Sequence, residues 1–480
     1  MARVVLVLLL AAAGCHVDLN DPGTEPLAAM FYYPAGILLD PDQKHLYVTN
    51  GNSDLKYGGG TVQMIDLPAF EAAVAQFRAD PTVKNGCQVD PLDQMIVNCP
   101  EGPFIFAPDT VKVGNFAGNM QLQVTGPTTR RLFIGVRGDP SITWMDTDVG
   151  TDEPPSGHRL NCFTDPSKVA PQATPPGCDG DHLIQTYYCQ GQPNCVNDQS
   201  TIPPEPFGMV LDQGETSPGN PYARLLVSHL SGGQVMIVDA MNLGSMQKQI
   251  PYISSPFFHE DSLHRHGAYA LAPQRPGDPA SPWYMTSDIQ PVITTFRVAD
   301  LNVIIPSLEF SVGGVLPTGN DVRDLVFQAG GSRAFITQNN PPSVMVLDTR
   351  PQTGVNLPLT SVNQIIDVID VCQQPAHISL RTPIVEGAPG TPNRVQQRLY
   401  VVCFLSNQVM VVDPDQAEVL NTILVGRGPN TLAFVEGPHP RGYISNFSES
   451  TIGVLDLDPS SPTANRMVAR IGVPVPPMNP

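Results

Sequence analysis

The stretch Pro34–Leu67, PAGILLDPDQKHLYVTNGNSDLKYGGGTVQMIDL, decides the fold of this chain. It begins with a short apolar run and turns at Asp40-Pro41-Asp42. A strand with aromatic and β-branched residues follows at Leu46–Asn50, and after a glycine-rich loop a further strand, Thr61–Ile65, stops at Asp66. Aromatic and β-branched residues suit a half-buried sheet surface, whereas Gly, Pro, Asn and Asp mark turns. The stretch therefore predicts three short strands joined by turns.

The same order of segments returns six more times along the chain. Its clearest mark is the middle strand, which occurs at Leu46–Asn50, Arg131–Val136, Arg224–His229, Trp283–Ser287, Arg333–Thr337, Arg398–Val402 and Gly442–Asn446. The third strand of each repeat ends at an acid, expected to cap the following turn: Asp66, Asp146, Asp239, Asp300, Asp348, Asp413 and Asp456. The last two acids are 43 residues apart, and a four-stranded propeller blade occupies about 40–45 residues. A fourth strand is expected between repeats, as at Glu418–Val425.

Seven copies of such a unit predict a closed ring. One four-stranded sheet cannot bury both of its faces, whereas blades around a central axis cover one another. An open solenoid would need polar caps, and the sequence shows none. We therefore expect an all-β, seven-bladed β-propeller with disulfide-bearing loop insertions. The expected divisions are a lipoprotein signal peptide at 1–14, a tether at 15–30 and the propeller at 31–480, with blades near 34–114, 119–200, 206–253, 267–313, 319–371, 375–425 and 429–473.

The first and last repeats carry a recognisable signature. Pro34-Ala35-Gly36 precedes Leu46-Tyr47-Val48-Thr49-Asn50, and Gly428-Pro429 precedes Tyr443-Ile444-Ser445-Asn446. These segments resemble the YVTN-type β-propeller repeat of secreted bacterial proteins, although the second to fourth repeats are degenerate. The resemblance implies an exported bacterial propeller. It says little about activity, because that family includes surface-layer-like, binding and scaffold proteins, and its propeller relatives include lactonases.

The N-terminal residues predict export. Arg3 supplies one positive charge before Val4–Ala13, an apolar stretch that is too short to span a bilayer. The stretch ends in Ala12-Ala13-Gly14-Cys15, which resembles the lipobox of bacterial lipoproteins. The resemblance implies lipidation of Cys15, with acyl chains that hold the protein on a membrane. An ordinary signal peptide followed by a chance cysteine is the alternative.

Eight cysteines remain beside Cys15, an even number that suggests disulfides in an exported protein. Sequence alone leaves many pairings open. Proximity along the chain favours Cys87–Cys99, Cys162–Cys178, Cys189–Cys195 and Cys372–Cys403.

The charge balance argues against one class of partner. The 480 residues include 45 acids and 26 basic residues, which gives a net charge of −19 with histidine neutral. Nucleic-acid binding needs clustered Lys and Arg, so we expect no nucleic-acid partner. The sequence also lacks Gly-x-Ser-x-Gly, phosphate-loop and His-Glu-x-x-His motifs. We expect no cofactor, and no residue is named as catalytic.

Large insertions interrupt the repeat. They are Pro68–Pro108, Thr151–Ser200, Asp212–Ala223, Pro273–Pro282 and Arg381–Gln396. The expected strand order places all of them on the ring face reached from first to second and from third to fourth strands. The first contains a predicted helix, Pro68–Arg78, with apolar residues on one side. Loops on a rigid scaffold commonly carry binding function; harmless tolerance of insertions is the alternative.

The opposite face has a histidine-rich loop, Ser254–His266. Because imidazole binds zinc and copper, its three histidines are weak metal-ligand candidates, without a defined zinc spacing: His259, His264 and His266. The candidate ligand-binding residues at the mouth of the central channel are His229, His264, His266, Asp288 and Arg323. A solvated loop that binds nothing is the alternative.

These features favour a lipid-anchored binding or scaffold module of the bacterial cell envelope. Its expected place is the outer membrane, on the periplasmic or the surface side, and its expected partner is an envelope protein or a polysaccharide. The alternative is a propeller enzyme of the lactonase or hydrolase type, with its site at the channel mouth.

Overall fold

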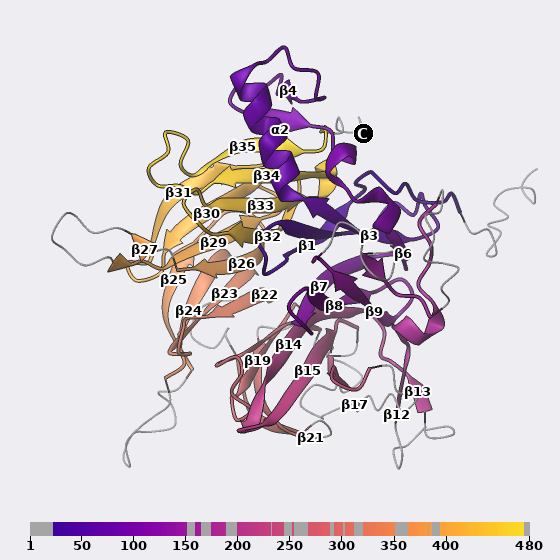
Figure 1. Ribbon diagram of the computed structural model, residues 1–480. Coiled ribbons are helices and arrows are strands. Elements are labelled where there is room, and N and C mark those ends of the chain that lie inside the picture. Colours follow the sequence, from indigo (N-terminus) through magenta and orange to yellow (C-terminus); the bar gives the residue numbers. More distant parts are fainter. Residues whose placement is uncertain are drawn as a thin grey trace, which may run out of the picture.

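The computed structural model describes residues 23–150, 159–164, 174–188, 199–231, 233–243, 252–253, 267–288, 292–300, 303–311, 320–350, 363–382, 384–385 and 394–474. Within these ranges the chain forms seven antiparallel β-sheets, or blades, that follow one another around a central axis (Figure 1). The all-β, seven-bladed prediction is therefore confirmed.

Each blade is built outward from the axis in chain order. The innermost strands are β1 (Pro34–Leu39), β7 (Ala117–Val124), β14 (Pro206–Ser217), β18 (Ala268–Pro273), β22 (Asn320–Phe327), β26 (Pro375–Arg381) and β32 (Pro429–Val435). The second strands are β2 (His45–Asn50), β8 (Thr129–Val136), β15 (Asn220–His229), β19 (Trp283–Ser287), β23 (Arg333–Asn340), β29 (Arg398–Cys403) and β33 (Arg441–Asn446).

The outer half of each blade continues the same order. The third strands are β3 (Gly60–Asp66), β9 (Ser141–Asp148), β16 (Gln234–Asp239), β20 (Val292–Asp300), β24 (Pro342–Asp348), β30 (Gln408–Asp413) and β34 (Thr451–Asp456). The outermost strands are β6 (Val111–Val113), β10 (Leu160–Asn161) with β11 (Leu183–Ile184), β17 (Tyr252–Ile253), β21 (Val303–Ser311), β25 (Gln364–Asp370), β31 (Glu418–Leu424) and β35 (Arg466–Ile471).

The remaining elements lie in the insertions and turns. They are the α-helix α2 (Leu67–Ala79), the short strands β4 (Gln88–Val89), β5 (Val97–Cys99), β12 (Thr186–Tyr188), β13 (Gln199–Thr201), β27 (Ile384–Val385) and β28 (Arg394–Val395), and the 3₁₀ turns η1 (Gly102–Phe104), η2 (Ala107–Asp109), η4 (Gly180–His182) and η6 (Phe447–Glu449).

The hydrophobic core lies between the blades rather than at the axis. Each pair of neighbouring blades shares one cluster of buried apolar side chains, and a further cluster joins the last blade to the first. In β2, Leu46 and Val48 pack toward the last blade, whereas Tyr47 packs toward the second. Successive side chains of a strand point to opposite faces of the sheet, and both faces of each blade are buried. The central strands are therefore nearly continuous apolar runs.

The threonine of the first repeat joins neighbouring blades. Thr49 is fully buried, and its Oγ1 donates to the carbonyl oxygen of Gly118 in the next innermost strand at 2.7 Å. Ser228 makes the equivalent bond to the Tyr269 carbonyl at 2.6 Å. The side chain of Tyr47 is fully buried in the core.

The first insertion, between β3 and β6, closes the ring. Its helix α2 covers the predicted 68–78 segment, begins at the N-cap Asp66 and buries Phe70 against the last blade. Strand β5 then pairs in parallel with β35, so that a segment near the start of the chain extends the sheet of the last blade. Figure 1 shows α2 and β4 beside the C-terminal strands β34 and β35. The insertion is therefore part of the scaffold.

Buried charges hold this closure together. The Arg470 guanidinium of β35 pairs with Asp90 of the insertion at 2.5 Å and with Glu449 of η6 at 3.0 Å. Burial raises the pKa of the Asp90 carboxyl, but hydrogen bonds from Asn98 and neighbouring backbone groups, with the charge of Arg470, lower it overall. Asp90 is therefore a stable anion at the joint.

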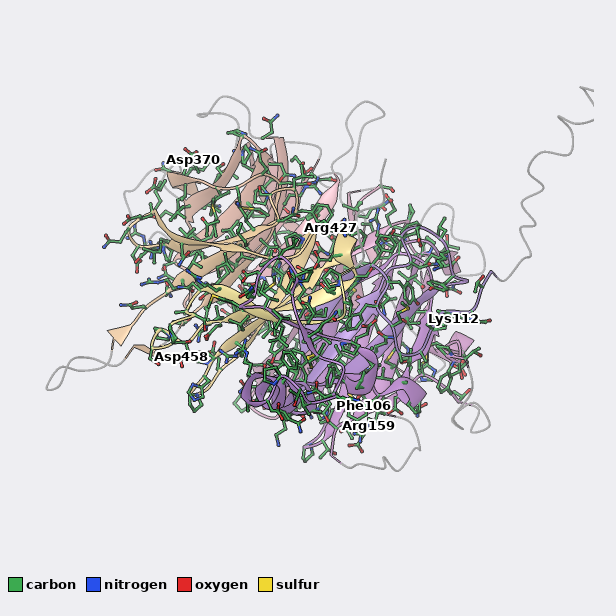
Figure 2. The ribbon with its side chains drawn as sticks, turned by 90° about the horizontal axis from the view of Figure 1, so that it is seen from above. Phe106, Lys112, Arg159, Asp370, Arg427 and Asp458 are labelled. Carbon is green, nitrogen blue, oxygen red and sulfur yellow. A yellow bond between two sulfur atoms is a disulfide. The ribbon has the colours of Figure 1, made fainter. Side chains whose placement is uncertain are left out.

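The described part of the second insertion packs on the first blade. The side chain of Arg159 lies over the ring of Phe106 at 4.5 Å, and its backbone N–H donates to Asp109 at 2.8 Å (Figure 2). The end of this insertion, β12 and β13, follows the outermost strand β11. It therefore belongs to the connection between blades, and the expectation that all five insertions share one face is wrong for this part.

Three of the four predicted disulfides are confirmed. They are Cys87–Cys99, Cys162–Cys178 and Cys372–Cys403. Cys189, Cys195 and the predicted lipidation site Cys15 lie outside the described residues.

Several of the closing acids cap the turn that follows them, as predicted. Asp66 accepts the Ala69 N–H at 2.9 Å, and Asp413 accepts the Asp415 N–H at 2.9 Å. Across the residues that the structure describes, no helix is both long and apolar enough to cross a membrane.

Candidate functional site

The central channel contains a cavity of about 780 Å³. All seven innermost strands contribute to its wall, and residues at or just after the ends of the second strands β2, β8, β29 and β33 lie at its mouth. A cavity of this size matches the sites at which proteins bind small molecules, about 300–1,000 Å³. The channel is therefore the first place to look for a ligand site.

Aromatic rings gather at the mouth of this cavity. The rings of Phe207 and Tyr269 are 4.4 Å apart, and those of Phe404 and Phe447 are 6.1 Å apart. The guanidinium of Arg137 lies 5.5 Å from the centre of the Phe207 ring. These rings, with Arg137, give the mouth an apolar collar beside a positive charge.

His229, one of the predicted pocket residues, is a core residue. Its side chain is fully buried, and Nδ1 donates to the Pro204 carbonyl oxygen at 3.2 Å. Burial lowers the pKa of the imidazole to about 4. His229 is therefore neutral at neutral pH, and it is not among the residues that line this cavity.

Asp288 and Arg323 do come together, in a charged cluster at the rim of blades four and five. Burial raises the pKa of the Asp288 carboxyl, and the nearby charge of Arg323 opposes that rise. Arg323 donates to Asp321 at 2.9 Å and lies over the Tyr269 ring at 4.7 Å. Because Asp321 already pairs with Arg323, this cluster holds the rim together and leaves Asp288 as its partly exposed acid.

The three histidines of the 254–266 loop, His259, His264 and His266, lie outside the described residues. Among the residues that are described, no group of three or more His, Cys, Asp or Glu side chains is arranged to hold a metal ion.

A different set of side chains is aligned inside the channel. Ser379 Oγ lies 2.8 Å from His377 Nε2, and His377 Nδ1 lies 2.7 Å from Asp324 Oδ2. All three residues line the cavity, and the side chains of His377 and Asp324 are 25% and 21% exposed. The structure thus places a hydroxyl, an imidazole and a carboxylate in one hydrogen-bonded row, within reach of a ligand in the channel.

Sequence reasoning missed these residues because the set is divided between two repeats. Asp324 belongs to β22 of the fifth blade, whereas His377 and Ser379 belong to β26 of the sixth. One signal could have found them. Gly36 and Leu38 of β1 occupy the places of His377 and Ser379 in β26, as the strand registers show. Two polar residues that alternate on an innermost strand lie on the same face of its sheet, close enough to bond each other beside the channel.

A larger hollow, about 1290 Å³, lies between the first insertion and the outer edges of the last two blades. Its wall includes Asp90, Glu449 and Arg470. Asp90 and Glu449 both pair with Arg470 in the ring closure, so this hollow is a less suitable site than the channel.

Comparisons with known proteins support the fold. No family model matches this chain, and no curated protein is similar to it in sequence. Among solved structures, the periplasmic gluconolactonase of Pseudomonas aeruginosa is 14% identical, with a TM-score of 0.50 over 84% of this chain and 89% of that one. A candidate 6-phosphogluconolactonase of Bacteroides fragilis is 14% identical, with a TM-score of 0.47 over 84% and 87%.

A third similar structure has a different activity. The hydrazine synthase of Kuenenia stuttgartiensis is 12% identical, with a TM-score of 0.47 over 92% of this chain and 98% of that one. The gluconolactonase, with a TM-score of 0.50, is 14% identical to this chain. At this level of identity the similarity establishes the architecture alone, and function must be argued from the site.

Proposed function

We propose that this protein is an exported, membrane-anchored binding module that holds the end of an envelope polysaccharide at the mouth of the central channel. The observation that carries the proposal is the aromatic collar over a cavity of about 780 Å³. Aromatic rings bind the apolar faces of sugar rings, and neighbouring amides and carboxylates bind the hydroxyl groups. The same wall carries three amide side chains, each of which makes one bond to the backbone of the next blade and has further hydrogen-bonding capacity: Asn119, Gln121 and Asn430.

The net charge of the protein narrows the range of ligands that we expect. A net charge of −19 repels polyanions at long range. The preferred ligand is therefore a neutral or amino sugar rather than an acidic or phosphorylated one. A partner protein on the envelope remains the competing occupant, and it would contact the rim rather than enter the channel.

Export and anchoring are part of the proposal. Disulfides persist in oxidising compartments such as the bacterial periplasm, and three are described here. Lipidation of Cys15 would hold the propeller at the membrane through the segment before residue 23. Mass spectrometry of the N-terminus tests this part, since cleavage before Cys15 with acylation is expected and an unmodified Cys15 in the envelope fraction would contradict it.

Binding at the collar is tested by Phe207→Ala. Loss of one aromatic contact costs about 0.5–1.5 kcal/mol, so we expect a Kd that is about 2-fold to 13-fold weaker for neutral oligosaccharides in titration calorimetry. Phe106→Ala is the matched control, because that ring is also half-buried but lies outside the channel. Equal affinities for both variants would contradict the proposal.

A further inference from the structure

The hydrogen bonds that join Ser379, His377 and Asp324 all point in the direction that a proton relay needs. A carboxylate accepts hydrogen bonds and donates none, so His377 Nδ1, at 2.7 Å from Asp324 Oδ2, must carry its proton on that side. In the neutral imidazole Nε2 then has a free lone pair. Ser379 Oγ, at 2.8 Å, can only donate to it. Asp324 thus fixes the tautomer in which His377 accepts the hydroxyl proton of Ser379.

The backbone holds these three groups in place. His377 and Ser379 are alternate residues of β26 and face the channel together. Asp324 is fixed twice, because Oδ2 accepts the Ile378 N–H at 3.1 Å and its own N–H donates to Thr337 Oγ1 at 2.9 Å. The Cys372–Cys403 disulfide joins the residues just before β26 to the end of β29. Such support by neighbouring groups is what a reactive set of side chains requires.

The three side chains do more than hold the innermost strands of neighbouring blades together. At two other joints around the channel, polar side chains of the innermost strands bond the backbone of the next blade and not another side chain of it: Asn119 donates to the Phe207 carbonyl at 3.1 Å and Gln121 accepts the Leu211 N–H at 3.3 Å. Thr431 likewise accepts the Ile37 N–H at 3.1 Å. Between β22 and β26 the bond from Ile378 to Asp324 already does this. His377 and Ser379 extend the set into the cavity beyond what that joint needs.

We propose that Ser379, His377 and Asp324 form a hydrolytic centre for esters or lactones, with Ser379 as the nucleophile. The proposal goes beyond saccharide binding and does not depend on it. A serine hydroxyl, a histidine base and a carboxylate that orients the base carry out acyl transfer on several unrelated folds, and they are identified by geometry rather than by sequence order. Asp324 is a positioning residue, and the other two are catalytic.

The reaction uses only the substrate and water. Ser379 Oγ forms a bond to the carbonyl carbon while its proton passes to His377 Nε2. The carbon–oxygen bond to the alcohol portion then breaks, and His377 returns the proton to the departing oxygen. The acyl group stays on Ser379 as an ester. Water, deprotonated by His377, attacks this ester, and the proton returns to Ser379 Oγ as the carboxylic acid departs. For a lactone, the alcohol and the acid are one product molecule.

The substrate class follows from the surroundings. The cavity of about 780 Å³ admits a small ester or a sugar lactone rather than a folded protein. Arg137 lines the same cavity, where its guanidinium pairs with Glu205 at 3.1 Å, so the lining favours no charged substrate over a neutral one.

Hydrolysis of p-nitrophenyl acetate and of gluconolactone by the full chain tests the proposal. An initial burst of p-nitrophenol is expected, followed by slower turnover. Ser379→Ala should lower kcat/KM by at least about 100-fold, with an unchanged Tm. Ser53→Ala is the matched control, because Ser53 lines the same cavity, and it should retain full activity. Saccharide binding should persist in Ser379→Ala, which separates this proposal from the binding function.

The roles of the other two residues need separate readouts. His377→Ala should lose activity and recover part of it with added imidazole, and Asp324→Asn should lower kcat with little change in KM. A wild-type rate equal to that of Ser379→Ala for both substrates would overturn the proposal. So would an equal loss in Ser53→Ala, which would show that the loss of activity is not specific to Ser379.

Discussion

The insertion between β3 and β6 and the innermost strands β22 and β26 use their polar side chains in different ways. In the insertion, Asp90 is buried against Arg470, and β5 adds a strand to the last blade. In β22 and β26, Asp324, His377 and Ser379 bond one another while remaining open to the channel. The irregular segment stabilises the ring, and the regular strands present reactive groups.

The length of an insertion in this ring is therefore no guide to where the functional residues lie. An insertion is conspicuous because it breaks the repeat, and loops on rigid scaffolds often bind ligands. Here the first insertion meets the unfilled edge of the last blade, where the ring must be closed without a strand exchanged between the chain ends. Substitutions in the two regions should therefore have different consequences: those at the closure should lower stability, and those in the channel should lower binding or turnover.

The largest effect on stability is expected from Arg470→Met at the closure. It leaves Asp90 buried without its counter-charge and Glu449 with Arg427 alone at 3.9 Å, and removing one partner of a buried ion pair costs about 3–5 kcal/mol. Urea denaturation should show this loss, while ester hydrolysis per folded molecule stays unchanged. Arg466→Met is the control, because Arg466 is exposed, and it should change the free energy of unfolding by less than about 1 kcal/mol. Equal effects of the two substitutions would show that the insertion does not close the ring.

A somewhat smaller loss is expected from the double substitution of Cys372 and Cys403 by Ser. The disulfide spans 31 residues, and closing a loop of that length in the unfolded chain stabilises the folded state by about 3–4 kcal/mol. Because this bond supports β26, the variant should also lose hydrolytic activity, unlike Arg470→Met. If the variant is destabilised but fully active, the disulfide does not help to hold the three channel residues in place.

A pH-dependent loss of similar or smaller size is expected from His229. Its pKa falls from 6.5 to about 4 in the folded state because of burial. Between these values the unfolded state binds more protons, so stability is complete above pH 6.5 and falls as the pH drops toward 4. The full difference is about 3 kcal/mol. His229→Gln should flatten this dependence in denaturation series at pH 7 and pH 4.5, and an unchanged slope would place the titration elsewhere.

The repeat, the predicted helix and three disulfides could be read from the sequence because each depends on nearby residues. Strand periodicity and turn chemistry set the blades, and proximity set the pairing of cysteines such as Cys87 and Cys99. The parallel pairing of β5 with β35 could not be predicted, since its partners lie at opposite ends of the chain and neither has a distinctive pattern.

The site was harder to predict for two physical reasons. His229 was assigned to the rim from its place at the end of a strand, but burial depends on how the neighbouring segments pack over it. The relay from Asp324 to Ser379 crosses a blade boundary, and only the ring brings these innermost strands together. Motif searches rely on spacing within one segment, whereas this set is defined by the register of two strands.

The central claim is that the chemistry of this protein lies in the channel, at Ser379. Peptide mapping by mass spectrometry after treatment with a fluorophosphonate ester tests it most directly, because such reagents form a stable adduct with a serine that is activated by a neighbouring base. The expected result is one adduct, on the peptide that contains Ser379, which is lost in His377→Ala. Absence of the adduct from the folded protein, or labelling that persists in His377→Ala, would contradict the claim.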